Sequence, residues 1–429
     1  MTWLLRLASV ATALLGALTV ADLKYRTSGI VLWPLKLLAC AVAPLVALIG
    51  AALALAGMKR RDPLAAGFGL LGALASIRYV RQSVAPHTGF ERAFDPGWQE
   101  RIPPAQRGRF LARRWTPIMP APPRGVCQRK VKYGVNPETG QNLLADLWLP
   151  PADQARSGLG VLYVHGGAWR LGTKDLGTRP FFRRLAGQGH VVMDIDYTLA
   201  PTTDVPGMVG DVKRALIWLK QNAGAYGVNP ERIVLIGGSA GGHLALLAAY
   251  THNDVALQPD GSTVDTSVRA VVSFYGPTDF LDVHEDVERN RLRLIRRKRI
   301  RPYGALVETL LQRGGVVSPG TPIEDAGNYV VQLLGAEPSE RPDLYEQLSP
   351  SGRVGPHCPP TLLLQGTADI FGMSRSVRRL HQLLQTAGVP SVLVEFPNSD
   401  HAFDLVLPRI SPAAQAATYD VERFLALMV

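Results

Sequence analysis

The first sixty residues are dominated by two long apolar stretches that polar residues interrupt only briefly. The first covers 3–21 (WLLRLASVATALLGALTVA) and the second covers 30–58 (IVLWPLKLLACAVAPLVALIGAALALAGM). Each is long enough to cross the roughly 30 Å hydrocarbon layer of a membrane as a helix. We therefore predict two transmembrane helices. If the first stretch were a cleaved signal peptide, the second would still anchor the chain.

A third apolar stretch, 63–77, is rich in Gly and Ala and shorter than the first two. Its length leaves three interpretations open, namely a third span, a re-entrant segment or an interfacial helix. Between about residues 81 and 124 the composition changes to Pro, Arg and scattered aromatic residues, which is typical of a linker or a loosely structured cap. We therefore divide the chain into a membrane-anchoring region (1–82), a linker or cap (83–125) and a globular domain (126–429).

Beyond this linker, short β-branched or leucine-rich runs alternate with helical patterns. The predicted strands are Val131–Val135, Leu143–Leu149, Leu159–Val164, Val191–Ile195, Ile233–Ile236, Ala270–Phe274, Thr361–Leu364 and Ser391–Glu395, and the clearest helices are Val205–Asn222 and Ser239–Tyr250. Several strands lack polar alternation, as expected for strands that are buried on both faces. The pattern predicts an α/β fold with a mostly parallel sheet between two layers of helices.

Composition narrows the choice of partners and cofactors. The chain has 429 residues, 47% of them hydrophobic, and a formal net charge of +11, which favours an anionic surface. The apolar N-terminal stretches favour a lipid bilayer over nucleic acid as that surface. The three cysteines, Cys40, Cys127 and Cys358, lie too far apart to indicate a zinc site or a disulfide framework.

The stretch IVLIGGSAGGHLAL, 233–246, ends a buried strand in a glycine pair and restarts as a helix. The pentapeptide GGSAG matches the nucleophile elbow G-x-S-x-G, in which small neighbours allow a strained serine between strand and helix. This would expose Ser239 at a helix N-terminus, where negative charge is favoured. A glycine-rich turn of this kind can also cradle a phosphate, and the pentapeptide alone leaves that interpretation open.

Three further motifs favour catalysis. Gly166 and Gly167 follow an upstream strand, and their backbone N–H groups, together with that of Ala240, could bind an oxyanion. Asp369 and His401 each follow a late strand. The order serine, aspartate, histidine is that of the α/β-hydrolase catalytic triad.

Together these motifs resemble a known family. The HGGAW stretch, DYTLAP, YGVNPERIVLIGGSAGG, FYGPTDF, QGTADI and DHAF are similar to those of α/β-hydrolase-fold esterases and lipases of the hormone-sensitive-lipase-like and feruloyl-esterase-like group, over about 130–429. The resemblance implies a carboxylic-ester hydrolase that needs no metal and no organic cofactor. It makes Ser239 the nucleophile, Asp369 the orienting acid and His401 the base. The oxyanion donors would be Gly166, Gly167 and Ala240.

One departure leaves the substrate open. Many members have an acidic residue before the nucleophile, where this chain has Gly238, a pattern associated with feruloyl-esterase-like, kynurenine-formamidase-like and prenylcysteine-methylesterase-like relatives. The expected substrate is an apolar or lipid-derived ester. The alternatives are an amide or formamide, a prenylcysteine methyl ester and, from another class, a non-catalytic membrane scaffold with a hydrolase fold.

Nearby polar residues have simpler interpretations. We expect His165 to hold the oxyanion loop and His243 to be structural. Asp211 is expected at a helix N-terminus, where the helix dipole favours an acid. Asp400 and Asp404 flank His401 but are poorly placed to reach its ring.

Two predictions concern the membrane. Basic residues 59–61, 78 and 81 follow the apolar stretches, so with two spans the positive-inside rule places the globular domain in the cytoplasm of a multi-pass protein. A basic insertion at about 281–345 holds eight Arg or Lys between Arg289 and Arg301, and either is simply solvated or docks on anionic head groups. We expect this insertion and the 81–124 segment to form the walls of the substrate pocket.

Overall fold

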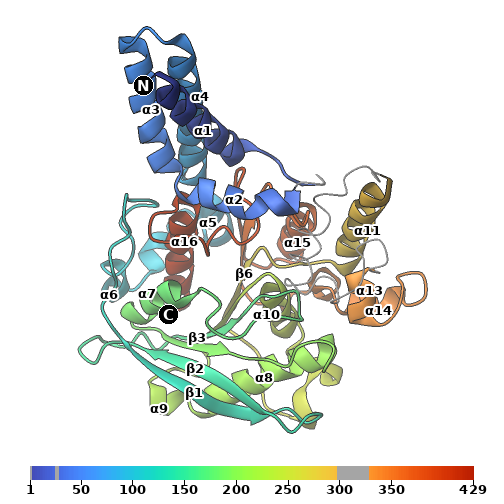
Figure 1. The fold of residues 1–429 in the computed structure, drawn as a ribbon. Coiled ribbons are helices and arrows are strands. Elements are labelled where there is room, and N and C mark those ends of the chain that lie inside the picture. Colours follow the sequence, from blue (N-terminus) through green and yellow to red (C-terminus); the bar gives the residue numbers. More distant parts are fainter. Residues whose placement is uncertain (1, 25–28, 297–327) are drawn as a thin grey trace.

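The computed structural model describes residues 2–24, 29–296 and 328–429 (Figure 1). Residues 297–301 of the predicted head-group docking run lie outside the described residues, so the docking prediction stays a prediction. The chain forms an α/β domain from which several N-terminal helices project.

One eight-stranded sheet forms the centre of the domain, in the order β1-β2-β4-β3-β5-β6-β7-β8. The strands are β1 (Val126–Val135), β2 (Asn142–Leu149), β3 (Gly160–Val164), β4 (Val191–Ile195), β5 (Ile233–Gly238), β6 (Ala270–Phe274), β7 (Thr361–Gly366) and β8 (Ser391–Phe396). β2 pairs antiparallel with β1 and β4, and all other pairs are parallel. The predicted mostly parallel sheet is therefore confirmed. The strands agree with the predicted ones to within two residues at each end, except that β1 begins five residues earlier than predicted.

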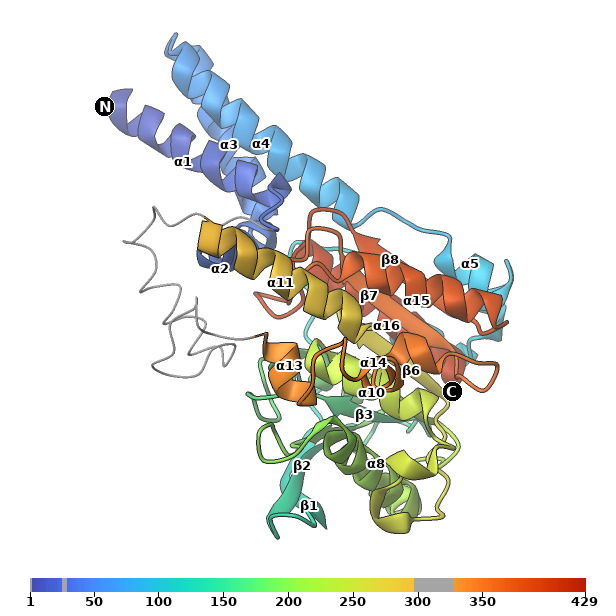
Figure 2. The same cartoon turned by 90° about the vertical axis from the view of Figure 1, so that its right-hand side faces the viewer.

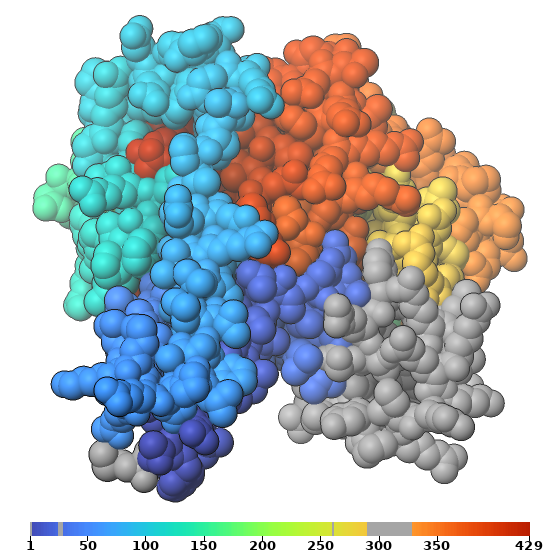
Figure 3. Space-filling model, turned by 90° about the horizontal axis from the view of Figure 1, so that it is seen from above, coloured from blue at the N-terminus to red at the C-terminus, as the bar shows by residue number. Residues whose placement is uncertain are grey.

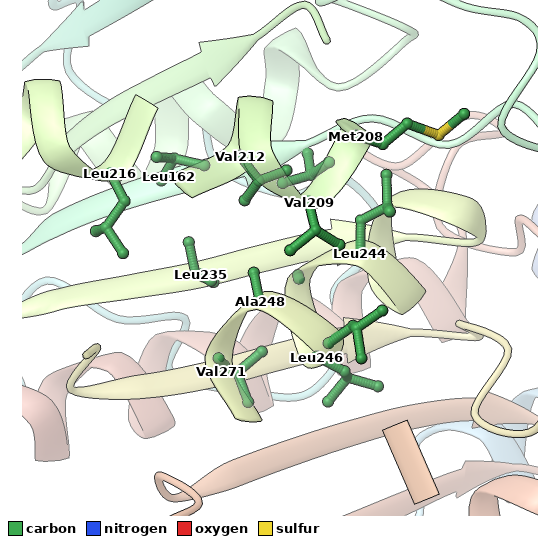
Figure 4. Close-up of a cluster of buried hydrophobic side chains, with 14 of the residues drawn as sticks. Leu162, Met208, Val209, Val212, Leu216, Leu235, Leu244, Leu246, Ala248 and Val271 are labelled. Carbon is green, nitrogen blue, oxygen red and sulfur yellow. The ribbon is translucent and has the colours of Figure 1, made fainter. Parts of the chain in front are cut away.

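Burial on both faces explains the continuous apolar runs. In β5 every residue is buried; Ile233 and Leu235 face one core, while Val234 and Ile236 face the other. The first core packs the sheet against α8 (Val205–Gln221), α10 (Ala240–Tyr250) and α15 (Ser374–Thr386). Figure 4 shows aliphatic side chains of α8 and α10 filling the space beside β3, β5 and β6.

The second core contains α7 (Arg179–Gly187) and α16 (Pro412–Met428). The 83–125 segment also belongs to it. This segment forms α5 (Gly89–Phe94), the 3-10 helix η1 (Trp98–Arg101) and α6 (Pro104–Arg107). Phe90, Phe94, Trp98 and Ile102 of this segment are buried in the same cluster as residues of β7 and β8. Its aromatic residues thus attach it firmly to the domain. Other α-helices in the described part of the domain are α9 (Ala223–Tyr226), α11 (Phe280–Arg296), α13 (Tyr329–Leu334) and α14 (Pro342–Gln347).

The N-terminal region contains four helices, α1 (Thr2–Val20), α2 (Gly29–Ala41), α3 (Ala43–Lys59) and α4 (Pro63–Ser83). By length and composition α1 and α4 can each cross a membrane, and α2 with α3 adds a third candidate if the pair counts as one span. The third apolar stretch is thus a 21-residue helix, longer than the pattern predicted. The second stretch is not the single helix predicted, because α2 and α3 meet at a 76° bend.

The bend separates two environments. α1, α3 and α4 extend together away from the domain, whereas α2 lies across the domain at their base (Figures 1 and 2). Seen from above, the N-terminal helices lie directly against the C-terminal part of the chain (Figure 3). The order of the helices places the start of α1 and the turn between α3 and α4 at the far end, where Arg6 pairs with Asp62 at 2.8 Å.

The three projecting helices pack through small residues. A Cβ on Gly16 would lie 2.7 Å from the carbonyl oxygen of Gly72, and one on Gly50 would lie 2.7 Å from that of Gly69. Large side chains such as Leu48 and Leu71 point outward and are 69% and 61% exposed. Small residues inside and large apolar residues outside are typical of helices packed in lipid.

Candidate active site

Ser239 lies on a sharp turn between β5 and α10. Its backbone has φ 55° and ψ −125°, a strained combination for a residue with a side chain. The glycines around it are required by close approach, because a Cβ on Gly237 would lie 2.2 Å from the carbonyl oxygen of Gly241, and one on Gly241 would lie 2.1 Å from that of Val164. The turn therefore has the geometry predicted from the GGSAG sequence, and Ser239 itself remains partly exposed.

The three residues of the predicted triad lie in one hydrogen-bonded line. Ser239 Oγ is 2.9 Å from His401 Nε2, and His401 Nδ1 is 2.9 Å from Asp369 Oδ2. Asp369 is fully buried and also accepts hydrogen bonds from Gln365 Nε2 at 3.0 Å and from the Phe371 N–H at 2.9 Å. These donors stabilise the carboxylate and fix its orientation.

Asp400 and Asp404 have other partners. Asp400 Oδ1 accepts from the N–H groups of Ile370 and His401, both at 2.8 Å, and its Oδ2 pairs with Lys36 Nζ at 2.9 Å. Asp404 accepts a hydrogen bond from the hydroxyl of Tyr275. Burial raises the pKa of Asp404 to about 6, while the hydrogen bond from Tyr275 acts in the opposite direction.

The predicted oxyanion residues lie beside the serine. A Cβ on Gly166 would lie 3.1 Å from Ser239 Cβ, and Gly167 has φ 128°, which only glycine adopts easily. Both glycines line the same cavity as Ser239 and His401. Ala240 is the first residue of α10, so its N–H group belongs to the helix N-terminus directly after the serine.

His165 holds the glycine loop, as expected. Its Nδ1 donates to the Gly166 carbonyl at 2.7 Å, and its ring stacks on Tyr197 with the centroids 4.5 Å apart. Burial lowers the pKa of His165 below its ordinary value. The imidazole is therefore a neutral donor that sets the shape of the loop.

His243 and Asp211 are also structural, although Asp211 is not where we predicted. His243 donates from Nε2 to the Leu348 carbonyl and accepts from Trp169. Asp211 lies seven residues into α8 and accepts from the N–H of Thr198, whereas the helix begins at Asp204, whose carboxylate caps it. The prediction for Asp211 was wrong because a carboxylate inside a helix can bind a neighbouring loop as well as the helix terminus.

An apolar cavity of about 350 Å³ opens at Ser239. Its walls include Tyr163, Leu176, Tyr275, Phe371 and Leu405 from the domain, and Ile30, Trp33 and Pro34 from α2. No residue of the 81–124 segment lines this cavity, which contradicts that predicted wall. The described residues of the insertion do not line it either, but residues 297–327 lie outside the described residues, so the wall predicted from the insertion stays a prediction. Residues 119–124 instead line a neighbouring cavity of about 620 Å³ that shares Leu405 with the first.

Sequence reasoning missed the contribution of α2, because the whole apolar stretch fitted a simple span. One signal was available. Lys36 stands alone in that stretch, and an isolated charge in an apolar helix usually has a buried partner or a function. A Cβ on Gly238 would lie 3.4 Å from the Tyr163 hydroxyl and 3.5 Å from that of Tyr275, which is ordinary van der Waals contact, so close approach does not require glycine at this position.

Comparisons with known proteins agree with this geometry. The BD-FAE family model matches residues 145–305. Esterase LipQ of Mycobacterium tuberculosis (strain ATCC 25618 / H37Rv) is 29% identical over 326 residues, which is 74% of this chain and 69% of LipQ. The probable carboxylic ester hydrolase LipM of the same organism is 32% identical over 298 residues, or 69% of this chain and 60% of LipM. The chain has the α/β-hydrolase fold and is similar in sequence to these esterases.

Two further matches are more limited in what they support. The apo form of Thermogutta terrifontis esterase 2 aligns with a TM-score of 0.50 and 22% identity over 70% of this chain and 93% of that chain, which supports the shared fold. A probable isoprenylcysteine alpha-carbonyl methylesterase of Oryza sativa subsp. japonica is 36% identical over 153 residues, about a third of each chain. The chain spans 69% of the length of LipQ, 60% of that of LipM and about a third of that of the rice methylesterase.

Proposed function

We propose that this chain is a serine carboxylic-ester hydrolase that is held in a membrane by its N-terminal helices. The observation that carries the proposal is the hydrogen-bonded line from Ser239 through His401 to Asp369 on a strained strand-to-helix turn. A serine is a weak nucleophile on its own, and a neighbouring imidazole that is oriented by a buried carboxylate is the arrangement that activates it.

In the proposed mechanism His401 takes the proton of Ser239 as the oxygen attacks the ester carbonyl. The negative charge that develops is stabilised by the N–H groups of Gly166, Gly167 and Ala240, each worth about 3 kcal/mol in comparable sites. His401 then protonates the departing alcohol. Water, activated by the same imidazole, cleaves the acyl-enzyme and regenerates the serine.

The proposed substrate is an ester with an apolar acyl or alcohol group. The cavity at Ser239 supports this choice, because its walls are formed by aromatic and aliphatic residues such as Trp33, Phe371 and Leu405. Such walls favour apolar groups by removing them from water. Their origin in both the domain and α2 is consistent with a substrate that reaches the site from a lipid surface.

The proposed membrane arrangement is multi-pass, with α1, α3 and α4 crossing the bilayer. In that arrangement the catalytic domain and the N-terminus lie on opposite sides. Lys59, Arg60 and Arg61 then lie at the far end with Arg6, away from the catalytic domain, because α4 is a full-length helix. These three residues therefore no longer argue for a cytoplasmic catalytic domain. Arg78 and Arg81 lie at the near end, so basic residues are found at both ends of the projecting helices and do not favour one orientation.

A serine-directed probe and an ester panel test the proposal. We expect a fluorophosphonate to label the detergent-solubilised full chain, and expect p-nitrophenyl esters to be hydrolysed. Ser239→Ala should abolish both, whereas Ser262→Ala, on a loop away from the cavity, should change neither. Labelling of the Ser239→Ala protein at wild-type level would remove Ser239 from the mechanism. Absence of labelling and turnover in the wild type would instead favour the non-catalytic scaffold.

A second candidate is a methylesterase that acts on prenylated cysteine. It is favoured by the local match to the rice methylesterase together with the membrane helices. Adding a farnesyl-cysteine methyl ester and an arylformamide to the panel separates the candidates. If the methyl ester is turned over with a much higher kcat/KM than any p-nitrophenyl ester, this alternative replaces the general esterase. The same result with the arylformamide would assign an amide hydrolase.

A further inference from the structure

α2 makes two polar contacts with the loop that carries the proposed base, and the segment before α2 contacts the loop that precedes the proposed acid. Trp33 Nε1 donates to the backbone carbonyl of His401 at 3.2 Å, and Lys36 Nζ pairs with Asp400 Oδ2 at 2.9 Å. Just before the helix, Lys24 Nζ donates to the Thr367 carbonyl at 3.0 Å, in the loop that precedes Asp369. The N-terminal region is therefore bonded to the catalytic loops as well as tethering the domain.

The pair formed by Lys36 and Asp400 is fully buried, with neither side chain exposed. A buried carboxylate is costly without a partner, and Lys36 is the cation that lies against it. The same carboxylate accepts the N–H groups of Ile370 and His401, which follow Asp369 and Asp400 in sequence. One ion pair thus joins the loop of the proposed acid to the loop of the proposed base.

α2 also forms one wall of the cavity at Ser239. Ile30, Trp33 and Pro34 line it, and the Trp33 ring meets the edge of the Phe371 ring at a centroid distance of 5.7 Å. The Trp33 and His401 rings are 6.3 Å apart. Since the bend at Val42 turns α2 across the domain, Trp33 and Lys36 are brought to the site by the same feature that ends the apparent span.

We propose that α2 is a built part of the active site, in which Lys36 positions His401 through Asp400 and Trp33 forms a specificity-determining wall for the apolar part of the substrate. This inference rests on the proposed esterase function and adds that the isolated α/β domain is an incomplete enzyme. Lys36 touches neither substrate nor reacting atoms, so it is a positioning residue. Trp33 acts on the substrate by contact.

The test of Lys36 uses the full chain in detergent or nanodiscs, with turnover of p-nitrophenyl butyrate expressed per active site titrated with a fluorophosphonate. Lys36→Met keeps the aliphatic stem and removes the charge, and we expect kcat per titrated site to fall ten- to a hundredfold with KM changed less than threefold. Lys36→Arg should restore most of the loss. Lys59→Met, an exposed lysine at the end of α3, is the matched control and should match the wild type.

A double substitution tests the route through Asp400. If Lys36 acts by neutralising that carboxylate, Lys36→Met combined with Asp400→Asn should be several-fold more active per site than Lys36→Met alone, because no uncompensated charge remains. Equal kcat per titrated site in Lys36→Met and Lys59→Met would overturn the positioning role, as would a double variant no better than the single one. If Lys36→Met cannot be isolated folded, Trp33→Phe, which removes the N–H bonded to the His401 carbonyl and keeps a smaller aromatic ring in the wall, takes its place and should lower kcat several-fold.

The role of Trp33 as a wall is tested with esters of different acyl chain length. Trp33→Ala should raise KM for p-nitrophenyl octanoate at least fivefold more than KM for p-nitrophenyl acetate, with a smaller effect on kcat. The same change in KM for both esters would contradict a wall role. Failure of the wild type to label or hydrolyse any ester would reject the proposed function, whereas an active wild type with unaffected α2 variants would reject this inference alone.

Discussion

The catalytic domain and the projecting helices are packed in opposite ways. In the domain, large residues such as Leu162 and Phe182 are fully buried between sheet and helices. In α1, α3 and α4 the contacts are made by Gly16, Gly72 and similar small residues, while the large apolar side chains point outward. Burying apolar groups stabilises a protein only where the surroundings are water, and helices in lipid gain instead from close backbone approach. The packing difference is the one that the proposed membrane arrangement requires, with water around the domain and lipid around the projecting helices.

α2 belongs to neither pattern. Lys36 is buried against Asp400 and Leu37 is also buried, whereas Leu35 and Leu38 are each 43% exposed. α2 thus combines a polar contact with the domain and an exposed apolar surface. The proposed membrane arrangement requires such a mixed surface of a helix at the boundary between bilayer and water.

The largest expected effect is a loss of kcat in the catalytic domain when the proposed orienting acid is replaced. Asp369→Asn should lower kcat by about 10³–10⁴-fold, because an amide cannot orient and stabilise the imidazolium as the carboxylate does. Asp404→Asn should cost far less, since Asp404 bonds to Tyr275 and not to the imidazole. The measurement is the steady-state kcat per titrated active site of the two variants. A nearly silent Asp369→Asn beside a severe Asp404→Asn would mean that the orienting acid has been misassigned.

The next prediction tests whether the projecting helices cross a bilayer, on which the contrast between these helices and the domain depends. Single cysteines are placed at Arg60, in the turn between α3 and α4, and at Gln141, in the turn between β1 and β2, after the native cysteines are replaced by alanine. In whole cells an impermeant maleimide should label one site strongly and the other only after permeabilisation. Which site is labelled in intact cells gives the orientation. Equal labelling of both before permeabilisation would exclude the proposed three crossings.

A smaller effect should follow from enlarging a small residue between the helices. A Cβ on Gly72 would lie 2.6 Å from the carbonyl oxygen of Thr12, so Gly72→Leu must push α1 and α4 apart. Overpacking of this kind typically costs about 1–3 kcal/mol. Gly67→Leu on the same helix is the matched control, since no atom lies within 4 Å of a Cβ there. We expect the apparent melting temperature in mild detergent to fall for Gly72→Leu only, and an equal fall for both variants would contradict close packing at Gly72.

Local sequence signals predicted the fold of the domain and the residues around Ser239 well. The elbow, the glycine loop and the strand runs each depend on residues that are adjacent in sequence, because tight turns and buried strands impose local requirements. The same reasoning could not place α2. A proline and a lysine within an apolar stretch do not say whether the stretch bends, and the partner of Lys36 lies 364 residues away.

The pocket wall predicted from the 81–124 segment was wrong for a related reason. Trp33 and Phe371 meet only through the fold, and hydrophobic periodicity carries no information on which distant segments form a contact. The predicted third stretch ended at residue 77, before the end of α4, because the last residues of this helix, with Arg78 and Arg81, are less apolar than its centre. Side chains of that length can bury their stems and keep the charge in water, so a span can extend past the end of its apolar run.

The smallest effect concerns pH and involves only the catalytic domain. Burial lowers the pKa of His190 to about 3 and that of His243 to about 4, from about 6.5 in the unfolded chain, so below pH 6.5 the unfolded state binds more protons and the folded state loses stability. Asp404 has the opposite sign, because its pKa is raised to about 6 and its protonation stabilises the fold as the pH falls below 6. Between pH 6 and pH 4 unfolding of the chain therefore takes up about one proton in total at His190, His243 and Asp404. This net uptake lowers the free energy of unfolding by about 1.4 kcal/mol for each pH unit that the pH falls.

The pH dependence of the melting temperature in one detergent checks this balance. His190→Asn should make the slope between pH 6 and pH 4 shallower, whatever it does to stability at pH 7, since a histidine that binds a proton only in the unfolded state over this range is removed. Asp404→Asn should make the slope steeper, because a carboxyl that acts in the opposite direction is lost. Wild-type slopes in both variants would show that other groups control the acid sensitivity. Because neither residue lies in the projecting helices, Gly72→Leu should shift the whole curve downward and leave its slope unchanged.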